Sequence, residues 1–373
     1  MSQFKTLVDG MIGSGAFETI LRNPRAQFGL PGQRLLGATL LPERAVLNNS
    51  FTEWGVRYRT PIANDAARYS PPTKKGGFFV GKVEVRLVDQ DIAADYTSED
   101  YDAHIAMAQY GNPAQNAGNP TLTGAAGVEN WFDARINRPL IHKNELMRWQ
   151  AIVDAECKLA GANGYEDTLK YPNPPGHRFV VAGQWSDNNY DILANDIFPL
   201  RLAAAKKGNT LRRLIMSSTA AYKFLGNGKV RAAIGGLIVI NSAGALQPAQ
   251  QVVSLQSANA YLAANQLPAI EIYDELYQTQ AGSFPFLKRD VFVAVCSTGR
   301  DNSVSQADGT PIILPDTLGY HAIGRAAGQP APGRATDIAV FTNKPPRIEA
   351  QGWQTSAPVI TDPEAIYVGS GIA

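Results

Sequence analysis

Hydrophobic and polar residues alternate along two neighbouring stretches in the first quarter of the chain. Each has apolar residues at every second position: Trp54, Val56 and Tyr58 in residues 52–60, and Val83, Val85 and Leu87 in residues 83–92. This spacing is that of strands with two unlike faces, so we predict that the stretches pair as a hairpin. Roughly twenty residues separate them, far more than the two to five of an ordinary hairpin loop. A connection of this length is usually functional.

A spacing of three and four residues predicts helices elsewhere. The longest is expected from Glu129 to Ala160, where one stripe contains Leu146, Trp149, Ile152, Val153, Glu156 and Leu159. Pro139 should kink this helix or mark its true start, and Gly161 and Gly164 should end it. Further helices are predicted near the N-terminus, over 187–209 with Pro199 as a break and Gly208 as the cap, over 218–228 and over 254–268.

Strands are predicted between and after these helices. They cover residues 40–47, 177–183, 211–217, 269–277, 290–296, 320–326, 335–342 and 346–368. Residues 110–127, rich in Ala, Gly, Asn and Pro, are expected to form a flexible surface excursion. Helices and short strands mixed in this order predict an α+β fold.

Composition narrows the class of protein. The 373 residues, 45% of them hydrophobic, suffice for two or three domains with a substantial core. Lys and Arg number 34 and Asp and Glu 33, which gives a net charge of +1. Because no dense basic cluster is present, tight sequence-specific binding to DNA or RNA is not expected.

The cysteines and the N-terminus bear on the compartment. Cys157 and Cys296 lie far apart in apolar surroundings and are predicted to be reduced core residues. Asp9 and Glu18 interrupt the apolar residues of the N-terminal segment, which argues against a signal peptide, and no run is long enough for a membrane span. We expect folding in a reducing cytoplasm.

No constellation of catalytic residues is visible. The four histidines, His104, His142, His177 and His321, stand in separate settings without metal-ligand spacing. The stretch FLGNGKVRA, residues 224–232, lacks the spacer and the Ser or Thr of a phosphate loop, and a helix-ending turn is the better interpretation. No GxSxG motif occurs. We therefore predict no catalytic, cofactor-binding or metal-binding residue, and no enzyme.

The order of elements, together with three short stretches, resembles the major capsid protein of tailed bacteriophages, in the lambda-like branch of the Hong Kong-type capsid fold. The stretches are QTSAPVITDPEAIYV (Gln354 to Val368), FLKRDVFVAV (Phe286 to Val295) and GYHAIGRA (Gly319 to Ala326). The resemblance implies an N-terminal arm (1–39), a strand and extended loop (40–95), a peripheral domain with the spine helix (96–185), an inserted axial domain (186–335) and C-terminal strands that return to the peripheral domain (336–373).

The resemblance also implies a function. Such a chain assembles with itself through hexamers and pentamers into an icosahedral shell around viral DNA, and it is found in the virion after assembly in the host cytoplasm. Scaffolding, portal and decoration proteins are the implied partners, with nonspecific DNA contact, no cofactor and no membrane. The alternatives are the shell protein of an encapsulin-like cellular compartment, which shares the fold, and an unrecognised soluble enzyme.

Under this resemblance the long hairpin reaches a neighbouring subunit and lays one face on its spine helix. The candidate contact residues are Trp54, Val56, Arg57, Tyr58, Arg59, Lys74, Lys75, Phe78, Phe79, Lys82 and Arg86. Lys74 and Lys75 could instead cross-link, bind phosphate or only keep the hairpin tip soluble. We expect the last, since lysine on a hairpin edge prevents unwanted strand pairing.

Overall fold

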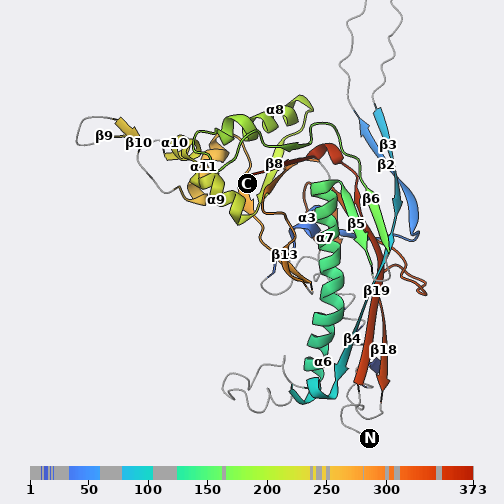
Figure 1. Ribbon diagram of the computed structural model, residues 1–373. Coiled ribbons are helices and arrows are strands. Elements are labelled where there is room, and N and C mark those ends of the chain that lie inside the picture. Colours follow the sequence, from blue (N-terminus) through green and yellow to red (C-terminus); the bar gives the residue numbers. More distant parts are fainter. Residues whose placement is uncertain are drawn as a thin grey trace, which may run out of the picture.

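The computed structural model describes most of the chain. The described residues are 10, 12–15, 17, 20, 33–58, 78–103, 124–161, 165–235, 238–240, 246–248, 253–279, 281–298, 302–305, 311–341 and 347–372. Of the long hairpin, residues 54–58 and 78–83 are described by their backbone alone. The predicted α+β class is confirmed, since a long helix and two five-stranded sheets dominate the architecture (Figure 1).

The first sheet is built around β19 (Arg347–Ile360), the longest strand described. Its antiparallel neighbours are β4 (Val88–Thr97) along one edge, and β18 (Ala335–Phe341) and β17 (Gly319–Ile323) along the other. Strand β1 (Glu43–Ala45) adds a parallel pairing to β17. Along the first half of β19 every second residue is buried, because one face of the sheet is covered by a helix.

That helix is the predicted long one, and it has three parts. An α-helix, α6 (Gly124–Phe132), passes into a π turn, η3 (Asp133–Asn137), and then into α7 (Arg138–Asp154). The helix lies along β4 and β19 (Figure 1). Gly352 of β19 permits this approach, since a Cβ there would stand 2.4 Å from Cγ2 of Ile136.

Proline explains the π turns. Pro139 is the second residue of α7, directly after η3. Pro199 has the same place in α8 (Phe198–Lys206), directly after the π turn η5 (Leu193–Ile197). A proline ring clashes with the carbonyl four residues earlier in an α-helix, and a wider π turn relieves that clash without ending the helix. Pro139 was predicted to kink the long helix or to mark its true start; it does not mark the start, since helical residues run on from Gly124, and the irregularity before it is the π turn η3.

The predicted end of the long helix was wrong. Ala155 has φ of 55° and stops α7, so that Glu156 and Leu159 lie on a strand, β5 (Glu156–Ala160). Strand β5 pairs with β6 (Glu166–Lys170). Cys157 and Leu159 are buried whereas Lys158 and Ala160 are exposed, which is the period of a strand.

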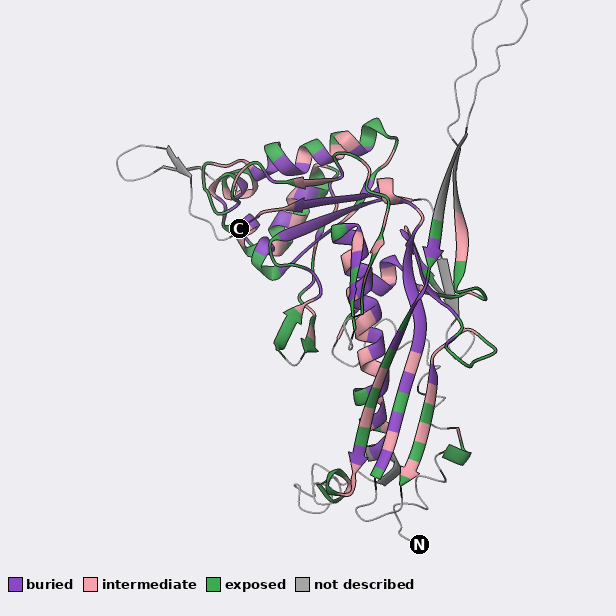
Figure 2. Cartoon of the chain, turned by 45° about the vertical axis from the view of Figure 1, so that its right-hand side comes forward, coloured by how far each residue is buried: buried purple, intermediate pink, exposed green. Residues whose placement is uncertain are grey.

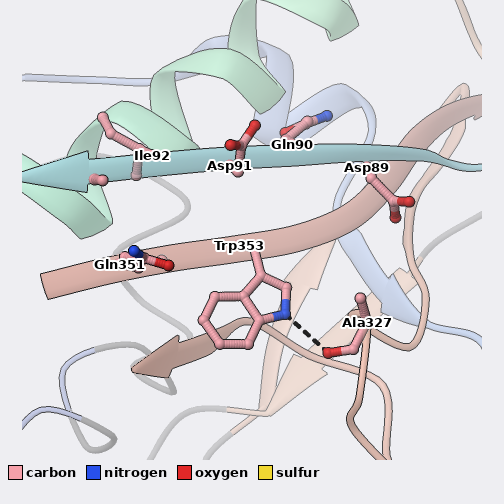
Figure 3. Close-up of a pocket in the computed structure, with 9 residues that line it drawn as sticks. Asp89, Gln90, Asp91, Ile92, Ala327, Gln351 and Trp353 are labelled. Atoms are coloured by element: carbon pink, nitrogen blue, oxygen red, sulfur yellow. Dashed lines mark hydrogen bonds between the residues drawn. The ribbon is translucent and has the colours of Figure 1, made fainter. Parts of the chain in front are cut away.

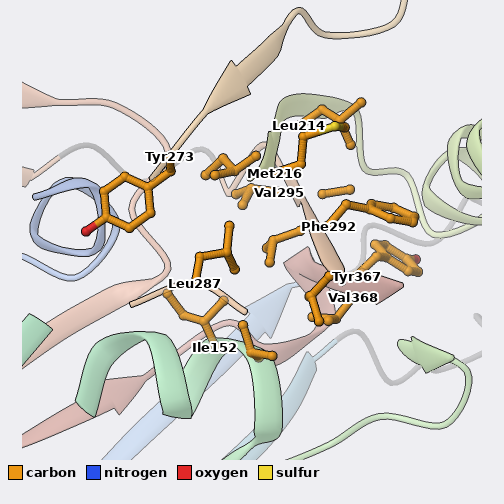
Figure 4. Packing of buried hydrophobic residues seen from close by; sticks show 14 of the residues in the cluster. Ile152, Leu214, Met216, Tyr273, Leu287, Phe292, Val295, Tyr367 and Val368 are labelled. Atoms are coloured by element: carbon orange, nitrogen blue, oxygen red, sulfur yellow. The ribbon is translucent and has the colours of Figure 1, made fainter. Parts of the chain in front are cut away.

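The second sheet has the order β11, β8, β14, β20, β7. Its strands are β11 (Ile270–Ile272), β8 (Leu211–Met216), β14 (Val291–Cys296), β20 (Ile366–Ser370) and β7 (Arg178–Val180). The helices packed around it are α8, α9 (Ser218–Gly226), α10 (Gly228–Gly235) and α11 (Leu255–Ala264). Every residue of β14 is buried, and Figure 4 shows Phe292 and Val295 packed with Leu214, Tyr367 and Val368.

One continuous core joins the two sheets. It includes Ile152 of α7, Leu36 of the short helix α3 (Leu36–Leu40), and Phe292 of the second sheet. Figure 4 shows Ile152 below Leu287 at this junction. A smaller core at the other end of the long helix contains Phe132 and Phe17, whose ring centroids are 4.8 Å apart. Phe17 therefore ties part of the N-terminal arm to its own chain.

Four further strand pairs stand apart from the two sheets. They are β2 (Ser50–Tyr58) with β3 (Phe78–Arg86), β12 (Leu276–Thr279) with β13 (Gly282–Pro285), β15 (Asn302–Ser305) with β16 (Pro311–Leu314), and β9 (Ile238–Ile240) with β10 (Leu246–Pro248). The first of these pairs is the predicted long hairpin.

Most other predicted elements are confirmed with shifted bounds. The helices over 218–228 and 254–268 begin after caps in which the hydroxyls of Ser217 and Ser254 accept backbone N–H bonds. Gly208, with φ of 74°, follows α8 as the predicted cap. Two strand predictions were wrong in part. Residues 36–40 are helical, so only Glu43–Ala45 of 40–47 is a strand, and residues 273–275 divide 269–277 into β11 and β12.

The predicted domain boundaries stay a proposal. Strand β17, from the range expected to be axial, pairs in the first sheet, while β20, from the C-terminal range, pairs in the second. The predicted N-terminal helix falls mostly outside the described residues, as does most of the predicted surface excursion at 110–127.

Candidate assembly surface

The long hairpin is a two-stranded ribbon that extends away from the body. Nine antiparallel residue pairs join β2 to β3, from Ser50 with Arg86 to Tyr58 with Phe78. Within the described part of the chain no third strand pairs with either one. Figure 1 shows the ribbon leaving the molecule beside β6, and its tip, residues 59–77, lies outside the described residues. Among the described residues, both long edges of the ribbon are therefore without a strand partner.

The register of the ribbon decides which residues share a face. It pairs Trp54 with Lys82 and Val56 with Val80, two steps apart on the same side. Tyr58 and Phe78 form the next pair on that side. One face of the ribbon thus combines five apolar or aromatic positions with Lys82, whereas Arg57 is paired with Phe79 on the other face.

The root of the ribbon is fixed to the first sheet. Val85 and Leu87 are buried against Tyr320, Ala322, Ala357 and Val359. The Tyr320 hydroxyl donates a hydrogen bond of 2.8 Å to Glu53, and the Arg44 guanidinium lies 4.8 Å from the Tyr320 ring centroid. The backbone N–H of Leu87 donates to the carbonyl oxygen of Asn49, where the chain turns from β3 into β4. Figure 2 shows that the part of the first sheet next to this root is largely buried.

The structure places the predicted contact residues unevenly. Trp54, Val56, Arg57, Tyr58, Phe78, Phe79 and Lys82 occupy the paired backbone of the ribbon, whereas Arg59, Lys74 and Lys75 lie outside the described residues. Arg86 forms an ion pair of 3.4 Å with Asp167 of its own chain. The second arm of the hairpin, predicted to run as far as Ile92, was predicted too long, since β3 ends at Arg86 and Val88–Ile92 pairs with β19. The role of these residues between subunits stays a prediction.

Below the root, a buried polar cluster links the strand that leads into the ribbon to the long helix. Glu43 of β1 accepts hydrogen bonds from Arg334 at 2.6 Å and from Arg148 of α7 at 3.5 Å. Burial alone would raise the pKa of Glu43, but the two guanidinium groups outweigh it and hold that pKa below its usual value. Arg148 also contacts Glu145 at 3.3 Å, and both side chains are fully buried. We call Glu43, Glu145, Arg148 and Arg334 the four-charge cluster.

Glu145 contacts three separate segments of the chain. Its Oε1 accepts from the Gly37 N–H at 2.7 Å, from the Trp149 indole N–H at 2.9 Å and from the Tyr273 hydroxyl at 2.8 Å. These donors come from α3, from α7 and from the segment between β11 and β12. The rings of Trp149 and Tyr273 also stack at 5.0 Å. One carboxylate therefore joins the N-terminal segment, the long helix and the second sheet.

The sequence reasoning missed the four-charge cluster. A signal was present, because Glu145 and Arg148 stand on the same stripe of α7 as the buried Ile141 and Ile152. Charged residues inside an apolar stripe are seldom buried without partners. Arg148 meets Glu43 across 105 residues of sequence, and Glu43 meets Arg334 across 291. Local spacing cannot reveal such pairs.

Other candidate chemistry gives no site among the described residues. They contain no group of three or more His, Cys, Asp or Glu arranged to hold a metal, and none of their helices is long and apolar enough to cross a membrane. Cys157 and Cys296 are buried and form no disulfide, as predicted for core residues. In the stretch at 224–232, Asn227 caps α10 by accepting from the N–H groups of Lys229 and Val230. The turn between two helices is thus confirmed.

Comparison with known proteins identifies the fold. No protein-family model and no curated protein matches the sequence. The structure is similar to a protein described as the capsid protein of a prophage of E. coli CFT073, with a TM-score of 0.53, 12% identity, and coverage of 96% of this chain and 98% of that chain. It is also similar to a phage-related protein from Bordetella bronchiseptica RB50, with a TM-score of 0.50, 13% identity and coverage of 96% of both chains.

An encapsulin complex from Synechococcus elongatus PCC 7942 aligns over 89% of this chain and 85% of its own, at 9% identity and a TM-score of 0.38. The two stronger likenesses show that this chain has the tailed-phage capsid fold, and the fold predicted from the sequence is confirmed.

The Gly37 contact yields a prediction about stability. A Cβ at Gly37 would stand 2.8 Å from both oxygens of Glu145, which three hydrogen bonds and Arg148 hold in place. Gly37→Ala should lower the free energy of unfolding by about 1–3 kcal/mol in chemical denaturation, although alanine is normally the better helix residue. Gly226, exposed in α9 with open space around its Cα, is the matched control. Gly226→Ala should stay within about 0.5 kcal/mol of the parent. Equal behaviour of the two variants would contradict the tight contact.

His321 yields a prediction about pH. It is fully buried in β17, and burial together with the charges of Arg148 and Arg334 lowers its pKa well below 6.5. Between the folded pKa and about pH 6.5 the unfolded chain binds a proton that the folded chain does not, so stability is complete above about pH 6.5 and falls as the pH drops. One such group contributes a slope of up to about 1.4 kcal/mol per pH unit. His321→Gln should flatten the dependence of unfolding free energy on pH between about 6.5 and 5. An unchanged slope would exclude His321 as its source.

Proposed function

We propose that this protein is the major capsid protein of a tailed bacteriophage, which assembles with itself through hexamers and pentamers into an icosahedral shell around viral DNA. The fold supports this proposal, because the chain spans nearly the whole length of a protein described as a prophage capsid protein. The observation that carries it is the β2–β3 ribbon. A two-stranded hairpin is at best marginally stable alone in water, and this one has an apolar face on its register.

A neighbouring copy of the chain is the partner we propose for that face. Identical subunits form rings through heterologous contacts, in which a projecting element of one subunit meets a different surface of the next. The root of the ribbon is held by its own chain through Val85, Leu87 and the Glu53–Tyr320 hydrogen bond. The outer part of the ribbon therefore projects from a root that is held in place. Many modest contacts of this kind in one shell act together through avidity.

The remaining assignments follow from the same proposal. The chain would act as a structural protein rather than an enzyme, with scaffolding, portal and decoration proteins as its partners and the virion as its location. A net charge of +1 suits close packing of identical chains, which a large net charge would oppose. DNA inside the shell would be contacted without sequence specificity.

Electron microscopy of the purified full-length protein tests this function. We expect closed shells or ring-shaped capsomers, since the ribbon requires a second subunit. Particles that carry DNA would support the capsid, whereas particles filled with a cargo protein would support an encapsulin-like compartment. A protein that stays monomeric at high concentration, with its fold intact by circular dichroism, would contradict both.

Deletion of the hairpin tip tests the ribbon itself. Removing Ala66 to Gly77 leaves the buried root and both cores untouched, so the body should fold and melt like the parent. Assembly should fail, because one contact per subunit is lost all round the shell. Sedimentation velocity should detect monomers or capsomers in place of shells. Closed shells from this variant, or a large drop in its melting temperature, would refute the assigned role.

A further inference from the structure

A wide groove runs beside the long helix, on the side of the first sheet that this helix covers. Its volume is about 800 Å³. The helix forms one wall with Ala134, Arg135, Arg138, Pro139, His142, Lys143 and Leu146, and the other walls are Ile92 to Ala94 of β4, Leu276 to Thr279 of β12, and Gln33. The groove is thus built from three elements that the four-charge cluster and the two cores hold in place.

The charges in this groove have one sign. Its charged lining residues are Arg135, Arg138 and Lys143, and no described lining residue is Asp or Glu. His142 is not counted among these charges, because burial and the charge of Arg138 lower its pKa, and the nearby Glu275 only partly opposes this. Arg135 is exposed. Arg138 also pairs with Asp133 at 2.7 Å, outside the lining. Burial lowers the pKa of Lys143, so its ammonium group is incompletely hydrated and an anion would stabilise it.

The opposite face of the same sheet has the opposite sign. Its exposed or half-exposed carboxylates are Asp89, Asp91 and Asp95 of β4, Glu349 of β19 and Asp337 of β18. The register pairs Asp91 with Trp353, and Figure 3 shows Trp353 on β19 beside β4, with its indole N–H bonded to the carbonyl of Ala327. Arg347 pairs with Glu349 at 2.7 Å, which leaves an excess of negative charge on this face. A polyanion would be repelled here and attracted on the helix side.

We infer that the groove beside the long helix binds the phosphate backbone of double-stranded DNA, and that this side of the subunit faces the packaged genome. Arg135 and Lys143 are eight residues apart, or about 12 Å along the helix, so the cations form a row rather than a point. A row of this length can contact several consecutive phosphates of one DNA strand. Such contacts carry no sequence specificity, which would require hydrogen bonds to base edges. The inference rests on the proposed shell function, because only a shell gives one face of the subunit a genome to contact.

DNA binding by charge-altered variants tests this site. The full-length protein, kept below its assembly concentration, is titrated against a short fluorescein-labelled duplex, and anisotropy is followed as the salt concentration rises. Arg135→Gln combined with Lys143→Gln should lower the affinity about tenfold or more and reduce the slope of log affinity against log salt by about 1.8, since two phosphate contacts are lost. The control is Arg212→Gln with Lys158→Gln, which removes the same charge from exposed positions on β8 and β5. The control should bind like the parent.

A second variant covers the case in which Lys143→Gln unfolds the protein. Arg135→Glu alone changes an exposed side chain and should weaken DNA binding, while Arg212→Glu should leave it nearly unchanged. Equal losses in the groove variant and its control would overturn the inference, and so would undiminished DNA binding in the groove variants. Selective loss of binding to an acidic peptide such as polyglutamate, with DNA binding retained, would also overturn it. Failure here with normal shells would leave the proposed function standing, whereas failure to assemble in the parent would refute that function first.

Discussion

The four-charge cluster is the constraint on which the rest of this structure depends. Glu43, Glu145, Arg148 and Arg334 supply two charges of each sign, and removal of either member of a buried pair strands its partner at a cost of about 3–5 kcal/mol. Through Glu145 the cluster also fixes Gly37 and Tyr273. The strand before the ribbon, the long helix and the segment next to the second sheet consequently all contact the same buried cluster.

The buried cluster fixes the interior, whereas the ribbon and the exposed surfaces on either side of the first sheet are open to a partner. The ribbon is anchored at its root and open along its length, and the two faces of the first sheet differ in charge. In the proposed shell, a subunit whose ribbon projects in one direction and whose sheet faces differ in charge would join its copies in only a few orientations. Curvature of a shell needs such restriction, because a contact that tolerated many angles would yield sheets and aggregates as readily as closed particles.

Much of this architecture could be predicted from the sequence, and the reason lies in local periodicity. The alternation around Trp54 and the stripe containing Trp149 identified the hairpin and the long helix. The end of that helix could not be predicted, because Glu156 and Leu159 continue the helical spacing of Ile152 and Val153, and only the left-handed backbone of Ala155 ends the helix before them. The cluster was missed for a different reason, since its members meet only through tertiary contacts. The tip of the candidate surface stays a prediction.

The spread of the four-charge cluster along the chain affects how the protein is made. Glu43 meets Arg334 across 291 residues, and the long helix meets Tyr273 across 128. During synthesis the hairpin sequence therefore leaves the ribosome long before Tyr320 and Arg334, which hold its root and the strand that leads into it. Contacts of such long range form late and slow the folding of a chain. A truncated chain without Tyr320 and Arg334 would lack the contacts that hold the root of the ribbon, so under the proposed function an incomplete chain would be unfit to join a shell.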